Sequence, residues 1–179
     1  MLGNITSTIY LFFLALILAY LEVQIEGNNG WAAKLPTWRV TKGWIVRFSA
    51  GRPVTGYHLA LTAFLLLFFH YPVLWTEWSW AKELTVLASY LLLVAVWDFL
   101  WFVVNPAYGL RRYSAKYVWW FRRWFLGFPI DYYLAVILSA AFAWITPKPG
   151  ALQAWLETAG GLIFLAGLAA ALRSLLHRN

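Results

Sequence analysis

Residues 84–104 form an apolar run of 21 residues in which Asp98 is the only ionisable side chain. About 20 apolar residues are enough to cross the hydrocarbon core of a bilayer as an α-helix. A carboxylate inside such a run is costly unless it is partnered, protonated or in contact with water. The run therefore predicts a transmembrane helix, and Asp98 marks a candidate functional site.

The hydropathy pattern predicts an all-α membrane bundle with five transmembrane helices, folded as a single integral membrane domain over residues 1–179. The five spans are expected at residues 8–25, 56–75, 84–104, 130–146 and 151–172. A composition with 63% hydrophobic and 12% charged residues is typical of a multi-pass membrane protein and not of a soluble domain.

Residue content also limits the cofactors. The chain has no cysteine, which excludes iron–sulfur clusters, thiolate zinc sites and disulfides. His58 and His70 are twelve residues apart on one predicted helix, about 18 Å along its axis, so they cannot both ligate one haem. A divalent metal held by carboxylate and imidazole ligands stays open.

Basic residues are concentrated in the first and third connections between the spans. The first contains Lys34, Arg39, Lys42, Arg47 and Arg52, and the third contains Arg111, Arg112, Lys116, Arg122 and Arg123. The positive-inside rule places both connections in the cytoplasm, which puts the amino terminus outside and the carboxyl terminus inside. Topology accounts for most of the net charge of +7, so a nucleic-acid partner is not expected.

The two basic connections are also rich in Trp and Tyr, which prefer the headgroup level of a membrane. This pattern predicts an aromatic belt along the membrane face. The competing interpretation is a binding platform for lipid headgroups or polyprenyl phosphates, with Arg122 and Arg123 facing phosphate. In either case we expect membrane lipids as partners.

An ungapped shift of 76 residues aligns several unusual positions of the chain with each other. The matched pairs include Glu22 with Asp98, Asn29 with Asn105, Trp44 with Trp120, Arg47 with Arg123, Gly51 with Gly127 and Pro53 with Pro129. The shift predicts a parallel 2+2 repeat of residues 8–75 and 84–146, with the fifth helix outside it. Six identities in 36 positions exceed chance only modestly, so coincidence is the competing interpretation.

The fifth predicted helix has Gly160 and Gly167 near one face. Small residues at such positions allow two helices to approach closely. The partner helix belongs either to this chain or to a second copy, which leaves a homo-oligomer open.

With this orientation, Asp98, Glu22, Glu26 and His58 lie at one level near the cytoplasmic face. Asp98 is six residues from the end of its span, about 9 Å deep, and Glu22 is about 5 Å deep. Glu26 follows Glu22 by four residues and shares its helix face. Asp131 begins the fourth span at the same level. These side chains predict a polar pocket that faces the cytoplasm.

Three interpretations of the pocket compete. In the structural one, the carboxylates pair with basic loop residues, and Asp131 stabilises a helix amino terminus. In the catalytic one, Asp98 and Glu22 form an acid–base pair supported by His58 and Glu26, or all four ligate a divalent metal. In the third, the acids conduct ions or protons, although they cluster on one side instead of crossing the membrane.

We predict a membrane-embedded enzyme that acts on a lipid-like or isoprenoid substrate in this pocket. The residues expected to bind the substrate and its polar head are Asn105, Arg111, Arg112, Trp120 and Arg123. No catalytic sequence motif identifies a reaction. The alternative is a non-enzymatic carrier, channel component or assembly subunit that uses the same acids to bind ions, protons or a partner.

Overall fold

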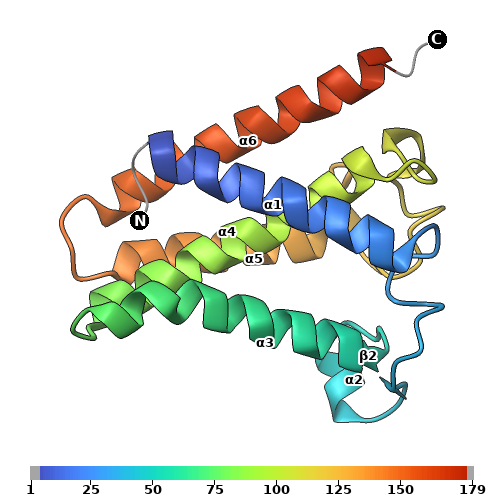
Figure 1. Cartoon of the computed structure of the whole chain (residues 1–179), viewed down its shortest axis with the longest axis horizontal. Coiled ribbons are helices and arrows are strands. Elements are labelled where there is room, and N and C mark those ends of the chain that lie inside the picture. Colours follow the sequence, from blue (N-terminus) through green and yellow to red (C-terminus); the bar gives the residue numbers. More distant parts are fainter. Residues whose placement is uncertain (1–4, 177–179) are drawn as a thin grey trace.

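The computed structural model describes residues 5–176 and shows a helical bundle (Figure 1). Its long helices are α1 (Ile5–Glu26), α3 (Gly56–His70), α4 (Trp80–Val104), α5 (Ile130–Ile145) and α6 (Ala151–Leu176). The shorter elements are α2 (Trp44–Phe48), the 3-10 turns η1 (Tyr71–Trp75) and η2 (Leu110–Arg112), and four two-residue strands. Strand β1 (Arg39–Val40) pairs with β2 (Val54–Thr55), and β3 (Trp124–Phe125) pairs with β4 (Phe128–Pro129), both antiparallel.

Four helices within the described residues are long and apolar enough to cross a membrane. They are α1, α3 together with η1, α4 and α6. Helix α5 has 16 residues, about 24 Å of length, which is less than the ~30 Å hydrocarbon core. Pro129 precedes it and Pro147 follows its last turn, and proline limits helix extension. The all-α membrane bundle agrees with the sequence analysis, while a fifth crossing at residues 130–146 stays a prediction.

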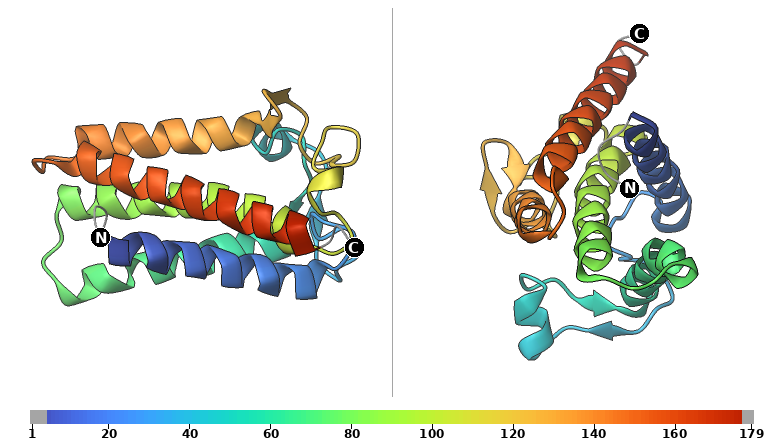
Figure 2. Two further views of the ribbon diagram at one scale, coloured as in Figure 1. Left: turned by 90° about the horizontal axis from the view of Figure 1, so that it is seen from above. Right: turned by 90° about the vertical axis from the view of Figure 1, so that its left-hand side faces the viewer.

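Helix α4 is the centre of the bundle and packs against α1, α3, α5 and α6. Figure 2 (right) shows it between α5 on one side and α1 and α3 on the other. It begins four residues before the predicted span because the Ser79 hydroxyl caps it, accepting a hydrogen bond from the Lys82 N–H at 3.3 Å. This most buried helix carries Asp98.

Helix α3 lies at the edge of the bundle, opposite α6 (Figure 1). It is the least buried of the four candidate spans. Among the long helices it packs mainly against α4, through Leu65 and Phe69, and the Phe69 ring meets Tyr90 edge-on at 5.8 Å. Helices α1 and α3 therefore pack little against each other directly.

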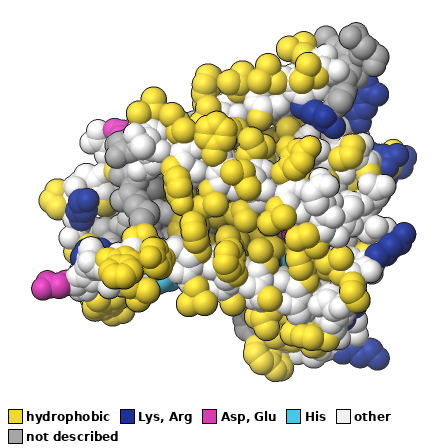
Figure 3. Space-filling view, viewed as in Figure 1, with side chains coloured by type: hydrophobic (Ala, Val, Ile, Leu, Met, Phe, Trp, Pro, Cys, Tyr) yellow, Lys and Arg dark blue, Asp and Glu magenta, His cyan; other side chains and the backbone are white. Residues whose placement is uncertain are grey.

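The two long connections lie at the same end of the bundle (Figure 2, left). Lys and Arg side chains gather at this end of the molecule, and hydrophobic side chains cover most of the middle (Figure 3). The described chain begins at the opposite end and α6 finishes at the loop end. This charge asymmetry is the one that the positive-inside rule uses, but which end faces the cytoplasm stays a prediction.

The connections have a packed aromatic core of their own. Trp120 is buried against the rings of Trp101 and Phe102, at 5.8 and 5.9 Å between centroids. Gly30 has a positive φ and lies so close to Trp120 that an added Cβ would overlap the ring. Of the aromatic residues expected at the headgroups, Trp119 is exposed, whereas Trp120 belongs to this core.

The internal repeat stays a prediction. A pair of antiparallel strands precedes both α3 and α5, and positive φ values occur at Ala50 and Gly51 and, 76 residues later, at Leu126 and Gly127. The connections otherwise differ, because α2 lies between β1 and β2, whereas two residues join β3 to β4.

Candidate functional site

A cavity of about 270 Å³ lies at the loop end of the bundle. Residues of α1, α3, α4, α5 and both long connections form its wall. Five residues that the sequence analysis selected line it: Glu22, Glu26, His58, Asp98 and Trp120. The four candidate catalytic residues are therefore brought together by helices that are far apart in sequence.

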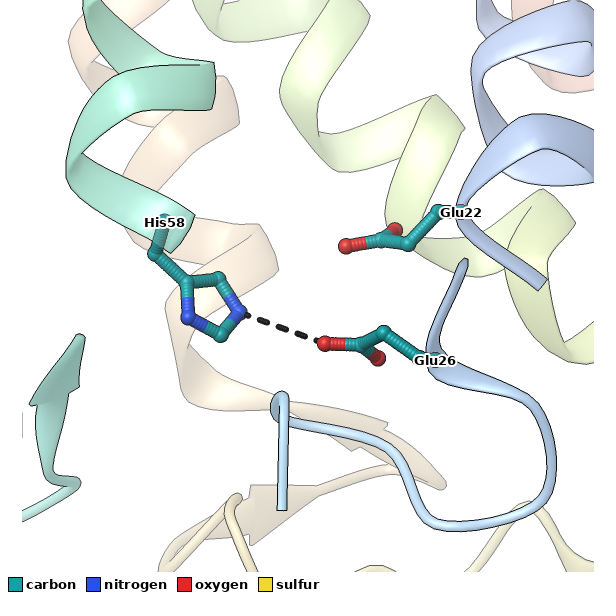
Figure 4. Close-up of side chains that lie close together, drawn as sticks. All are labelled: Glu22, Glu26 and His58. Atoms are coloured by element: carbon teal, nitrogen blue, oxygen red, sulfur yellow. Dashed lines mark ion pairs between the residues drawn. The ribbon is translucent and has the colours of Figure 1, made fainter. Parts of the chain in front are cut away.

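Glu22, Glu26 and His58 form a cluster with the donor set of a metal site (Figure 4). One ligand atom from each residue lies within 4.8 Å of the others, and Glu26 Oε1 is 3.7 Å from His58 Nε2. The two carboxylates are one turn apart at the end of α1, and the imidazole is in the first turn of α3. Carboxylate and imidazole are ligands for divalent cations such as Zn²⁺ and Mn²⁺.

His58 is oriented by its neighbours. Thr55 caps α3 by accepting a hydrogen bond from the His58 backbone N–H, and its hydroxyl also lies 2.7 Å from His58 Nδ1. The Trp31 ring stacks on the imidazole at 4.1 Å. Because Nδ1 is engaged by Thr55, Nε2 faces Glu26. Metal-binding histidines are held in the same way by a hydrogen bond at the second ring nitrogen.

The carboxylates of the cluster are held differently. Glu26 is buried, and its Oε1 accepts a hydrogen bond from the Ala32 backbone N–H, which folds the first connection back over α1. The Tyr57 hydroxyl and the Trp97 indole N–H both face Glu22. Neither makes a hydrogen bond of normal geometry with any residue in the described part of the chain.

Asp98 is separate from this cluster. It accepts a hydrogen bond from the Tyr132 hydroxyl on α5, and among residues 5–176 no cation lies within ion-pair distance of it. Burial raises the pKa of Tyr113, which adjoins Tyr132. The geometry groups three of the four predicted metal ligands and places Asp98 beside a tyrosine.

Arg52 is a residue of the cavity wall that the sequence analysis did not select. Its guanidinium lies over the rings of Trp31 and Phe121, at 4.7 and 5.4 Å, and is 3.4 Å from Asp131. Arg52 precedes His58, which is in the first turn of α3, by only six residues. This short separation could have indicated that Arg52 lies at the level of the predicted pocket. The structural interpretation pairs the carboxylates with basic residues of the loops, and Asp131 has such a partner in Arg52.

The other residues predicted to bind a substrate lie outside the wall of this cavity. Asn105 is fully buried, and its amide donates to Gly27 O at 3.2 Å, which ties the end of α4 to that of α1. Arg111, Arg112 and Arg123 are exposed, and Arg112 donates to a backbone carbonyl of its own connection. Their contact with a substrate stays a prediction.

The fold defines the class of this chain as a multi-pass helical membrane protein, with a carboxylate- and histidine-lined cavity at one end. No known protein family matches it, and neither a curated protein nor a solved structure matches it.

Proposed function

We propose that this protein is a membrane-embedded enzyme that binds a divalent cation at Glu22, Glu26 and His58 and acts on a lipid-like substrate, isoprenoids included. The observation that carries the proposal is the approach of three ligand atoms to within 4.8 Å of one another in the wall of a cavity. By the positive-inside rule, this cavity faces the cytoplasm.

The charges around the cavity favour a bound cation. Four carboxylates, those of Glu22, Glu26, Asp98 and Asp131, line it together with a single guanidinium, that of Arg52. Fully ionised, these groups carry a formal charge of −3, from −4 and +1. Buried charge without compensation is strongly unfavourable, and a divalent cation offsets two of the three excess charges.

The arrangement assigns different tasks to the carboxylates. A divalent cation polarises an oxygen of the substrate or lowers the pKa of a bound water. Asp98 lines the same cavity without belonging to the ligand cluster, so it is the group that accepts or returns a proton. The Tyr132 hydroxyl fixes the carboxylate by donating to it.

A lipid-like substrate fits the deeper wall of the cavity, which is mostly apolar. Leu61 on α3, Val94 and Ala95 on α4, and Ala135 on α5 belong to this part. The wall reaches Tyr90, eight residues before Asp98 on α4 and about 12 Å farther from the loop end. An apolar chain placed there leaves a polar head beside Asp98 and the proposed cation.

The metal part of the proposal is tested by elemental analysis of the protein purified in detergent. We expect about one divalent cation per chain in the wild type, and loss of that cation in Glu26→Gln and His58→Ala. Glu157→Gln is the matched control, because Glu157 is exposed on α6 and bonds only its neighbour Gln153 among the contacts seen in residues 5–176. Retention of the cation in both cluster variants would show that it binds elsewhere.

The enzymatic part needs a separate measurement. The protein is incubated with lipids extracted from membranes, with the cation or with a chelator, and the lipids are followed by mass spectrometry. We expect cation-dependent consumption of a lipid by the wild type and none by Asp98→Asn, which keeps the metal ligands. A metal-loaded protein that changes no lipid contradicts the enzyme and favours a carrier or assembly subunit.

A further inference from the structure

One buried hydrogen-bond donor in the cavity wall, the indole N–H of Trp101, makes no hydrogen bond with the described residues. Trp101 is 3% exposed. The indole N–H of Trp97, four residues earlier on the same helix face, is also buried, but it faces the Glu22 carboxylate. Buried polar groups are normally paired, so the wall at Trp101 is incomplete without a bound molecule.

The chemistry of this donor defines the group that completes the wall. An indole N–H can only donate, so its partner must be an acceptor, such as the oxygen of a hydroxyl, carbonyl or ester. Trp101 packs against the rings of Trp120 and Tyr108, at 5.8 and 5.1 Å between centroids, and no acceptor among residues 5–176 is hydrogen-bonded to its N–H.

With every carboxylate ionised, the formal charges favour an acceptor on an uncharged head. Arg52 is already paired with Asp131 and lies over two aromatic rings. With one divalent cation bound, the four carboxylates and Arg52 still carry a formal charge of −1, so a phosphate adds to an existing negative excess. A cationic head would compete with the metal for the same carboxylates.

The size of the cavity limits how much of the ligand enters. Its volume of about 270 Å³ is below the ~300–1,000 Å³ of pockets that hold drug-sized ligands. Only the head and the first carbons of a chain fit, and the remainder lies along the apolar wall toward the bilayer.

We propose that the cavity recognises the uncharged, oxygen-bearing head of an amphiphile through the indole N–H of Trp101. This inference deepens the proposed function and rests on it for the charge of the site, but the Trp101 donor does not depend on the metal. The substrate class is therefore a neutral lipid alcohol or ester.

The test compares three ligands with the same twelve-carbon chain and different heads: methyl dodecanoate, dodecyl phosphate and dodecyltrimethylammonium. Each is titrated into the purified, metal-loaded protein, and binding is measured by native mass spectrometry. We expect the ester to bind at least ten-fold more tightly than either charged probe. Equal or tighter binding of dodecyl phosphate would overturn the proposal.

Trp101→Phe keeps an aromatic ring and removes the donor together with part of the buried ring volume. We expect it to weaken ester binding about five- to ten-fold, as the loss of one hydrogen bond does, with unchanged metal content. Trp119→Phe is the control, because Trp119 is exposed and does not line the cavity. If Trp101→Phe binds the ester like the wild type, the ligand lies outside this wall and the inference fails.

Failure of this inference can be distinguished from failure of the proposed function. Trp101-dependent binding of the ester to a protein without metal supports the inference and contradicts the metal enzyme. Stoichiometric metal without preference for the ester supports the metal site and refutes the inference.

Discussion

Replacing His58 with alanine should remove the stabilisation that a divalent cation gives to this bundle. Helix α3 packs mainly against α4, and its first turn brings His58 to Glu22 and Glu26 of α1. A cation bound by all three residues would link α1 to α3 at the loop end. The variant loses this link and keeps the packing of α3 against α4.

The geometry indicates that binding requires little rearrangement. In a tetrahedral site with metal–ligand bonds of about 2.0–2.2 Å, two ligand atoms would be about 3.4 Å apart. The ligand atoms lie within 4.8 Å of one another, so the widest pair would close by up to about 1.4 Å. A cation at 100 times its dissociation constant stabilises the folded state by about 2.7 kcal/mol. If loss of the imidazole weakens binding about 100-fold, the same cation concentration contributes only about 0.4 kcal/mol.

The assay is unfolding of the purified protein in detergent, with a chelator and then with Zn²⁺ or Mn²⁺. The wild type should gain stability with the cation, and His58→Ala should not. His70→Ala is a matched control, because His70 lies at the opposite end of α3, where its Nε2 is 3.0 Å from Glu83 Oε1. A cation response of His58→Ala equal to that of the wild type would refute the cluster as the binding site.

Three further predictions concern topology and packing. The chain lacks cysteine, so Lys116→Cys and Lys148→Cys, on either side of α5, can each be labelled with an impermeant maleimide. We expect Lys116→Cys to be labelled from the cytoplasmic side and Lys148→Cys from the outer side, which would show that α5 crosses the membrane. Labelling of both variants from the same side would show that it does not. Ser139→Ala should cost about 1 kcal/mol in detergent unfolding, because Ser139 donates to a backbone carbonyl and accepts from the Trp155 indole, both at 2.7 Å; unchanged stability contradicts this. Asn105→Ala should cost about 1–3 kcal/mol in the same assay, without loss of bound metal.

The helices could be predicted from sequence because a bilayer requires long apolar segments with internally satisfied backbones. The observed ends depend on local signals. Ser79 extends α4 upstream of the apolar run, and the prolines around α5 leave it shorter than the other helices. Whether α5 reaches both faces of a membrane depends on the tilt of the bundle, which hydropathy does not specify.

The sequence predicted the depth of the candidate site residues along their helices, but not the direction in which each helix face points. Counting residues from the span ends places Glu22, Glu26, His58 and Asp98 at one depth, and the structure brings all four to one cavity. The rotation of α5 could not be obtained this way. The 76-residue shift also aligns Tyr57 with Tyr133, whereas Tyr132 is the residue that contacts Asp98. The two helices also begin differently, since α5 begins directly after Pro129 and α3 begins three residues after Pro53.

Access to Asp98 depends on the connections as much as on the spans. An isolated carboxylate at this depth is costly, and the structure offers it a tyrosine hydroxyl and a cavity in place of a cation. The aromatic side chains at the loop end of that cavity, those of Trp31, Trp120 and Phe121, come from the two basic connections. The Arg52 guanidinium lies over the rings of both Trp31 and Phe121, so this one side chain links the two connections. Aromatic and basic residues that the sequence assigns to the membrane surface therefore also line the cavity that contains Asp98.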